Sequence, residues 1–340
     1  MSGGREQIIA RYLEPTPLPP GVTSREIVCR AIEFDGPARI PFSFIQPFES
    51  DFCEMAVVSA LLGRRDGAGG RRSGRRGEIY YDEWGVGQEV TGRGWDHAAD
   101  HPLADLAKLG DYRFPGVADS ERFDPLMPYA LRARAAGKYC LGFDPIMMFE
   151  RARSLVGFEE LMIAPYEQPQ GLEALLDRLA DLAIGVIEQW ARMGCVDGFM
   201  TWEDWGLQTT LQMKIETFRE FYKPRYARIV EAAHERGMHY IWHCCGFIVD
   251  IIPDMIEMGV DAVQLDQPRL MGHRNLTDAF GGKICFWNTV DIQWSTSANV
   301  TPFHSAGTSL RSRVTPGSEC VTASRVPLRR FTSVDLPTFG

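Results

Sequence analysis

The stretch that decides the fold is Met238-His239-Tyr240-Ile241-Trp242-His243-Cys244-Cys245-Gly246. Its apolar half predicts a buried β-strand, and its glycine predicts the end of that strand. Side chains alternate between the two faces of a strand, so His243 and Cys245 point the same way and Cys244 points the other way. Zinc accepts an imidazole and a thiol as ligands. The alternative interpretation is a buried histidine beside two core cysteines.

Apolar runs alternate with amphipathic helical patterns along most of the chain. The predicted strands are Ile40–Ile45, Tyr139–Phe143, Gly198–Trp202, Met238–Trp242, Ala262–Leu265 and Ile284–Thr289. The predicted helices are Gly171–Met193, Ile215–Arg236, Ile248–Met258 and Asn275–Phe280. Units of this kind predict parallel strands joined by right-handed crossovers.

Polar and reactive residues follow the carboxyl ends of successive predicted strands. They are Asp144, Glu203 with Asp204, His243 with Cys245, Asp266 with Gln267, and Asn288 with Asp291. A (β/α)8 TIM barrel brings such residues together at one mouth. The alternative architecture is a doubly wound sheet. A sheet of the Rossmann type would show a glycine-rich fingerprint after its first strand, and this sequence has none there. We therefore predict an α/β protein built on a TIM barrel.

The composition argues against several classes of protein. The chain has 340 residues and a formal net charge of -9, which disfavours a general binder of nucleic acid or anionic membranes. No apolar run approaches the roughly 20 residues of a membrane span, and the first residues lack the apolar core of a signal peptide. The 8 cysteines are scattered, which indicates reduced thiols. We expect a cytoplasmic protein with no nucleic-acid or membrane partner.

Two segments break the alternating pattern. Residues 63–77 are rich in glycine and arginine, and residues 302–340 are rich in Ser, Thr, Arg and Pro without a sustained period. We expect one barrel domain over residues 1–301, with 63–77 as an anomalous loop, and an irregular or disordered tail over 302–340. The composition changes sharply at both segments, so our hypothesis is that both are translated out of frame. The barrel would then be incomplete at its C-terminus.

A series of motifs resembles the uroporphyrinogen decarboxylase superfamily over roughly residues 25–295. The motifs are Gly36-Pro37-Ala38-Arg39-Ile40-Pro41, Asp82-Glu83-Trp84-Gly85, His101-Pro102-Leu103, Glu203-Asp204-Trp205-Gly206-Leu207-Gln208, Phe218-Arg219-Glu220-Phe221-Tyr222-Lys223-Pro224-Arg225-Tyr226, His243-Cys244-Cys245-Gly246, Ile252-Pro253-Asp254-Met255-Ile256-Glu257-Met258-Gly259-Val260-Asp261 and Gln264-Leu265-Asp266. The resemblance implies a (β/α)8 barrel with the active site in its mouth.

The superfamily holds two main chemistries, and the residues favour one of them. Its decarboxylases need no metal and carry an arginine-rich segment that holds the carboxylates of a porphyrinogen. This chain instead reads Phe42-Ser43-Phe44-Ile45-Gln46-Pro47-Phe48-Glu49 at the comparable place. Its cobamide-dependent methyltransferases carry H-x-C and a later cysteine on zinc, and His243 and Cys245 match the first part. The resemblance implies zinc, a thiol substrate and methylcobalamin, the corrinoid being free or carried on a separate protein.

Further site residues come from the strand ends. We expect Glu203 and Asp204 to be catalytic, with Glu203 as an oxygen ligand or an acid/base, and Asp144, Gln267 and Asn288 to bind substrate. Cys285 and Cys320 are the candidates for a third metal ligand, but Cys285 lies in mid-strand, where core cysteines are common. Two alternatives remain open. One is a metal-free decarboxylase, for which Arg39 is the nearby N-terminal arginine, and the other is a degenerate, non-catalytic barrel.

Overall fold

The protein is described here from a computed structural model that covers residues 18–43, 50–57, 75–91, 96–289 and 291–292, and the backbone of residues 308–310. Its main sheet has the order β1-β11-β10-β9-β8-β7-β6-β2. The strands are β1 (Phe42–Ser43), β2 (Phe52–Met55), β6 (Tyr139–Phe143), β7 (Gly198–Glu203), β8 (His239–Cys244), β9 (Ala262–Leu265), β10 (Cys285–Asn288) and β11 (Thr308–Leu310).

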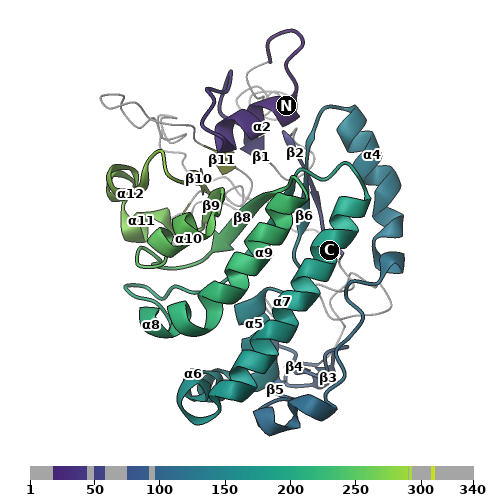
Figure 1. Cartoon of the computed structure of the whole chain (residues 1–340), viewed down its shortest axis with the longest axis vertical. Helices are drawn as coiled ribbons and strands as arrows, with labels where there is room; N and C mark the ends of the chain where they lie inside the picture. The colour runs from purple at the N-terminus through teal and green to yellow at the C-terminus, as the bar shows by residue number, and fades with distance from the viewer. Residues whose placement is uncertain are drawn as a thin grey trace, which may run out of the picture.

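The strands from β2 to β10 in this order pair in parallel, whereas β11 pairs antiparallel with both β10 and β1. The parallel part is curled, and the described strands form an incomplete (β/α)8 barrel (Figure 1). The predicted fold class is therefore confirmed. Of the two anomalous segments, 63–74 and most of 302–340 lie outside the described residues, so the frameshift hypothesis stays a prediction.

Helices cover the outside of the sheet. They are α4 (Met127–Ala135), α5 (Met148–Val156), α6 (Phe158–Glu167), α7 (Pro169–Arg192), α8 (Ile215–Thr217), α9 (Lys223–Glu235), α10 (Ile252–Met258), α11 (Pro268–Met271) and α12 (His273–Phe280), with α2 (Ser24–Ile32) at the amino ends of the strands. A small antiparallel sheet of β3 (Ile79–Tyr81), β4 (Gly87–Glu89) and β5 (His97–Asp100) lies at the other end of the molecule, near α5 and α6 (Figure 1).

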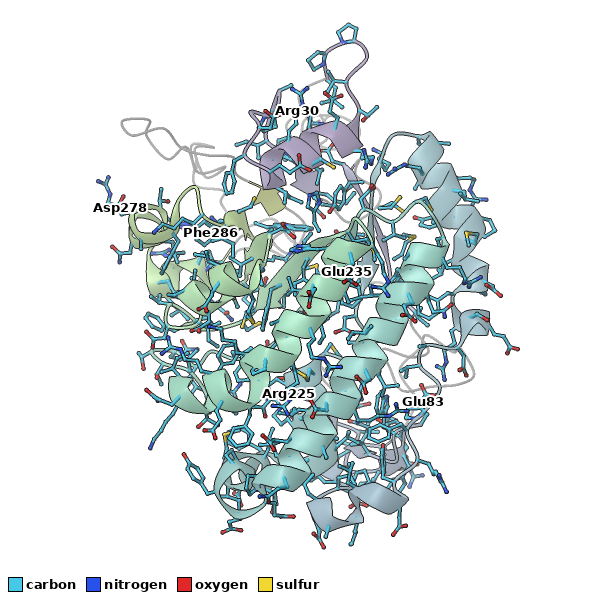
Figure 2. The ribbon with its side chains drawn as sticks, viewed as in Figure 1. Arg30, Glu83, Arg225, Glu235, Asp278 and Phe286 are labelled. Carbon is cyan, nitrogen blue, oxygen red and sulfur yellow. The ribbon has the colours of Figure 1, made fainter. Side chains whose placement is uncertain are left out.

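The longest helix, α7, runs beside α9, and a bidentate ion pair joins them. Arg225 of α9 donates from Nε and Nη2 to the carboxylate of Asp177 at 2.8 and 3.1 Å, and Figure 2 shows Arg225 between the two helices.

The predicted helix over 215–236 is divided into α8, a π-helical turn at Phe218–Tyr222 and α9. The division follows from Pro224, which has no N–H to continue the α-helical ladder. No helix of the described residues has the length and apolarity of a membrane span.

Strand alternation divides the apolar residues into two cores. Met200, Ile241 and Cys285 pack inside the curled sheet with apolar residues of α2, whereas Tyr240 and Trp242 pack between the sheet and the outer helices. This assignment fixes the direction of every other side chain on the same strands, because the side-chain period of a strand is two.

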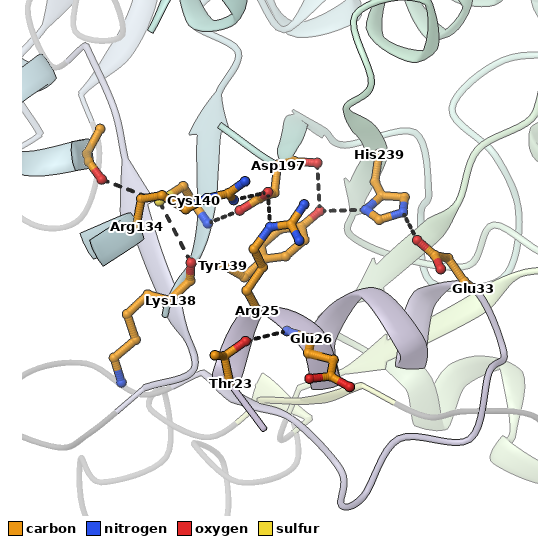
Figure 3. Close-up of polar contacts among 11 residues, drawn as sticks. Thr23, Arg25, Glu26, Glu33, Arg134, Lys138, Tyr139, Cys140, Asp197 and His239 are labelled. Carbon is orange, nitrogen blue, oxygen red and sulfur yellow. Dashed lines mark hydrogen bonds and ion pairs between the residues drawn. The ribbon is translucent and has the colours of Figure 1, made fainter. Parts of the chain in front are cut away.

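A buried carboxylate ties α2 and α4 to the amino ends of the strands (Figure 3). Asp197 accepts from Arg25 Nε at 2.6 Å, from Arg134 Nη1 at 2.5 Å and from the backbone nitrogen of Cys140 at 2.9 Å. His239 lies beside this cluster, with Nδ1 2.9 Å from the hydroxyl of Tyr139. Its second nitrogen is 3.2 Å from Glu33, so His239 is engaged in the scaffold.

We predict that Asp197→Ala destabilises the fold by about 2–3 kcal/mol, because it leaves the buried Cys140 N–H unsatisfied and two arginines unpaired. The value allows for the partial exposure of both arginines, 42% and 35%. Urea denaturation measures the change. Asp181→Ala, which removes an exposed pair with Arg228, should cost no more than about 1 kcal/mol. Equal losses for the two variants would contradict this role of Asp197.

Candidate metal centre

Three potential metal ligands meet at the carboxyl ends of β7 and β8. Asp204 follows β7, His243 lies near the end of β8, and Cys245 follows it. One ligand atom from each lies within 4.8 Å of the other two. All three side chains are partly exposed, as a site that must admit a substrate requires. The structure thus brings the predicted pair His243 and Cys245 together with Asp204.

His243 lies in a row of side chains that crosses the inner face of the sheet. Trp202, His243, Gln264 and Trp287 are register partners on β7, β8, β9 and β10. His243 Nδ1 lies 2.8 Å from Gln264 Oε1, and its Nε2 lies 3.7 Å from the sulfur of Cys245. The imidazole therefore has one nitrogen toward the neighbouring strand and the other toward the potential ligands.

Two glycines hold the loops after β7 and β8 against each other. Gly206 N donates to the carbonyl of Cys245 at 3.2 Å, and Phe247 N donates to the carbonyl of Leu207 at 2.7 Å. Gly246 has φ +81°, and a β-carbon on it would overlap the carbonyl of Gly206. A β-carbon on Gly206 would in turn overlap the backbone of Gly246 and Phe247. Only residues without side chains permit this approach, which carries Asp204 to the side of Cys245.

The electrostatics of the centre disfavour a free thiolate. Burial raises the pKa of the Cys245 thiol, and the nearby carboxylates of Asp204 and Asp266 raise it further. The thiol therefore keeps its proton at neutral pH when no cation is near. A coordinated divalent cation reverses this balance, because it stabilises the thiolate directly.

The donor set fits zinc. Tetrahedral zinc with Zn–S near 2.3 Å and Zn–N near 2.05 Å places the two ligand atoms about 3.5 Å apart. The distance of 3.7 Å between His243 Nε2 and Cys245 Sγ is close to this value. Three protein donors leave a fourth position open, which is the arrangement of catalytic zinc sites. Cys244 takes no part, because it is buried on the other face, where its sulfur accepts from the backbone of Trp205.

The side chains of Glu203 and Asp144 lie on the face of the sheet that the outer helices cover, and not on the face of His243 and Cys245. Glu203 accepts from the hydroxyl of Tyr226 at 2.7 Å and from the backbone nitrogen of Phe149 at 3.1 Å, near the start of α5. Asp144 accepts from Ile146 N at 2.8 Å and from Thr201 Oγ1 at 3.2 Å. Burial raises the pKa of Asp144 to about 6 and that of Glu203 well above its usual value. Both carboxyl groups hold local structure, and the structure does not bring them to His243.

The remaining predicted site residues have different surroundings, and one of them supports the loop of Cys245. Gln267 is buried and accepts from Gly246 N at 2.6 Å, so it anchors the loop of Cys245. Asn288 lies at the end of β10 with its side-chain oxygen buried and unpartnered among the described residues. Cys285 is buried in the inner core, and Cys320 lies outside the described residues.

Asp204 also lines a cleft of about 720 Å³ that the sequence did not reveal. Its walls also include Glu150 and Arg153 of α5, His97 at the start of β5, and His101 directly after the end of β5. Glu150 pairs with Arg153 through one oxygen, while its Oε1 is buried with no partner among the described residues. Burial raises the pKa of Glu150 to about 7, and repulsion from Asp204 adds to the shift. Of the wall residues, only Asp204 and His101 belong to the predicted site or to the quoted motifs of the sequence.

We predict that Gly246→Ala abolishes metal binding and destabilises the chain by at least about 2 kcal/mol, through backbone strain and overlap with Gly206. Gly237→Ala is the matched control, because Gly237 has φ +70° but no atom within 4 Å of an added β-carbon. The control should cost about 1 kcal/mol and keep the metal. Chelator competition and urea denaturation measure the two effects. Unchanged metal affinity in Gly246→Ala would contradict the role of this contact.

The comparisons with known proteins agree with the fold and with the motifs of the sequence. A solved structure of a methyltransferase from Methanosarcina mazei has a TM-score of 0.55 and 14% sequence identity to this chain. The alignment covers 78% of this chain and 83% of that protein, and it supports the fold alone. No curated protein matches the sequence. Residues 147–286, from the start of α5 to β10, match the family model of uroporphyrinogen decarboxylase (URO-D). This part of the chain is therefore similar to the URO-D family.

Proposed function

We propose that this chain is a zinc-dependent methyltransferase, which moves a methyl group from a methylated corrinoid to the sulfur of a small thiol. The observation that carries the proposal is the convergence of Asp204, His243 and Cys245 within 4.8 Å at the end of β8. His243 and Cys245 would hold the ion, and Asp204 would be the third donor.

The chemistry follows from the acidity of thiols. A free thiol has a pKa near 8.5 and attacks as the thiolate. Zinc, when bound, would keep the substrate thiol deprotonated at neutral pH. In the overall reaction the thiol loses a proton and its sulfur forms a bond to the methyl carbon. The cobalt–carbon bond of the corrinoid breaks, and its electron pair remains with the corrinoid.

The cleft beside Asp204 supports the same proposal. Its volume of about 720 Å³ is sufficient for a small-molecule thiol. Asp204 belongs both to the cleft wall and to the triad, so the cleft adjoins the proposed metal site at this residue. We infer that the thiol enters here, and that the corrinoid approaches from the mouth of the barrel, free or on a separate protein.

Among the described residues, the positions of Arg39 and Arg153 disfavour a porphyrinogen decarboxylase. Arg39 donates to both oxygens of Asp51, at 2.7 and 2.9 Å, beside the amino end of β2. Arg39 therefore lies at the amino ends of the strands, whereas His243 lies near the carboxyl end of β8. Among the residues that line the cleft beside Asp204, Arg153 is the one arginine, and it pairs with Glu150. A substrate with many carboxylates requires several bidentate arginines.

The metal content of the purified protein tests the proposal. We expect about one zinc per chain, lost in the double variant His243→Ala/Cys245→Ala, as a site with these two ligands requires. Cys244→Ala is the matched control, because its thiol lies on the opposite face of the strand. The metal-loaded protein should then transfer methyl groups from methylcobalamin to a thiol, and the double variant should not. A folded wild-type protein that binds no zinc would contradict the proposal.

A further inference from the structure

We propose that Gln264 is a positioning residue that fixes the proton of His243 on Nδ1, and so presents a bare Nε2 to Cys245 and Asp204. The inference rests on the proposed metal site for its purpose, but the tautomer itself is a property of the metal-free protein. Gln264 belongs to the motif Gln264-Leu265-Asp266, but the motif does not indicate this role, because a glutamine within a strand has many ordinary explanations.

The first argument is geometric. Gln264 is the register partner of His243 on the adjacent parallel strand β9. Its Oε1 lies 2.8 Å from Nδ1, whereas Nε2 lies 3.7 Å from the sulfur of Cys245. A neutral imidazole carries one N–H, and the other nitrogen has the lone pair that a metal needs. The amide oxygen of Gln264 can only accept a hydrogen bond, so Nδ1 carries the proton and donates to it, and the lone pair lies on Nε2.

The second argument concerns rigidity. Trp202 lies on the other side of His243, with the two rings edge to face at a centroid distance of 6.1 Å. Gln264 is itself flanked by Trp287 in the next strand. The imidazole is therefore held between two strands, and not on a loop, and positioning from regular strands is more exact than positioning from loops.

The third argument is the choice of an amide instead of a carboxylate. Asp204 already brings one carboxylate within 4.8 Å of the ligand atoms of His243 and Cys245. A glutamate at position 264 would add a second negative charge beside them and would make the imidazole a more basic ligand. Gln264 orients His243 without adding charge. Gln264→Glu should therefore keep the tautomer and bind zinc at least as tightly as the wild type.

Nitrogen NMR of the histidines and zinc titration test the inference together. In metal-free wild type, we expect the His243 signals of the Nδ1–H tautomer. Gln264→Leu keeps much of the volume but removes the acceptor, so His243 should lose this fixed tautomer. Its zinc affinity, measured by chelator competition, should fall ~10- to 100-fold. Gln264→Glu should restore both properties, which separates hydrogen bonding from packing.

Gln189→Leu, on α7 and away from the metal centre, is the matched control and should resemble the wild type in both measurements. Two results would overturn the inference: an Nε2–H tautomer in the wild type, or a Gln264→Leu variant whose tautomer and zinc affinity are unchanged. A wild type that shows the Gln264-dependent Nδ1–H tautomer but binds no zinc would uphold the positioning role and overturn the proposed function.

Discussion

The contact between Gly206 and Gly246 is the constraint on which the candidate site depends. Parallel strands place the ends of β7 and β8 side by side, but strand pairing alone does not bring the two following loops together. The glycines allow these loops to touch backbone to backbone, with Gly206 N donating to the carbonyl of Cys245. Gln267, which follows β9 and precedes α11, reinforces the arrangement by accepting from Gly246 N. Asp204 lies near the thiol of Cys245 as a consequence, and Asp204 also forms part of the wall of the cleft.

Strand alternation then separates two kinds of carboxyl group that are neighbours in the sequence. Glu203 is the last residue of β7 and faces the helices, where it accepts from Tyr226 and from the start of α5. Asp204 is the next residue and belongs to the triad with His243. One buried carboxyl supports the scaffold while the other is available to a metal. His239 and His243 lie on the same face of β8 and differ in their position along the strand. His239 is engaged by Tyr139 and Glu33 at the amino end, whereas His243 lies near the carboxyl end.

Much of this organisation could be predicted from the sequence, because it depends on local periodicity. The strands Tyr139–Phe143 and Ala262–Leu265 have the predicted limits, and α7 lies within two residues of its predicted ends. The strand β2 was missed, because Phe52-Cys53-Glu54-Met55 is too short to show a period. The pairing of Gln264 with His243, the contact of the two glycines and the cleft at Glu150 are tertiary features. They depend on strand register and loop approach, which no single stretch of sequence reports.

X-ray absorption at the zinc edge of the metal-loaded protein tests the central claim most directly. The account predicts one Zn–S distance near 2.3 Å and nitrogen or oxygen ligands at about 2.0–2.2 Å, including one imidazole. Cys245→Ala should remove the sulfur, and Asp204→Ala should change only the oxygen contribution. A shell of oxygen and nitrogen without sulfur, or a spectrum that neither variant alters, would show that zinc does not lie between Asp204, His243 and Cys245.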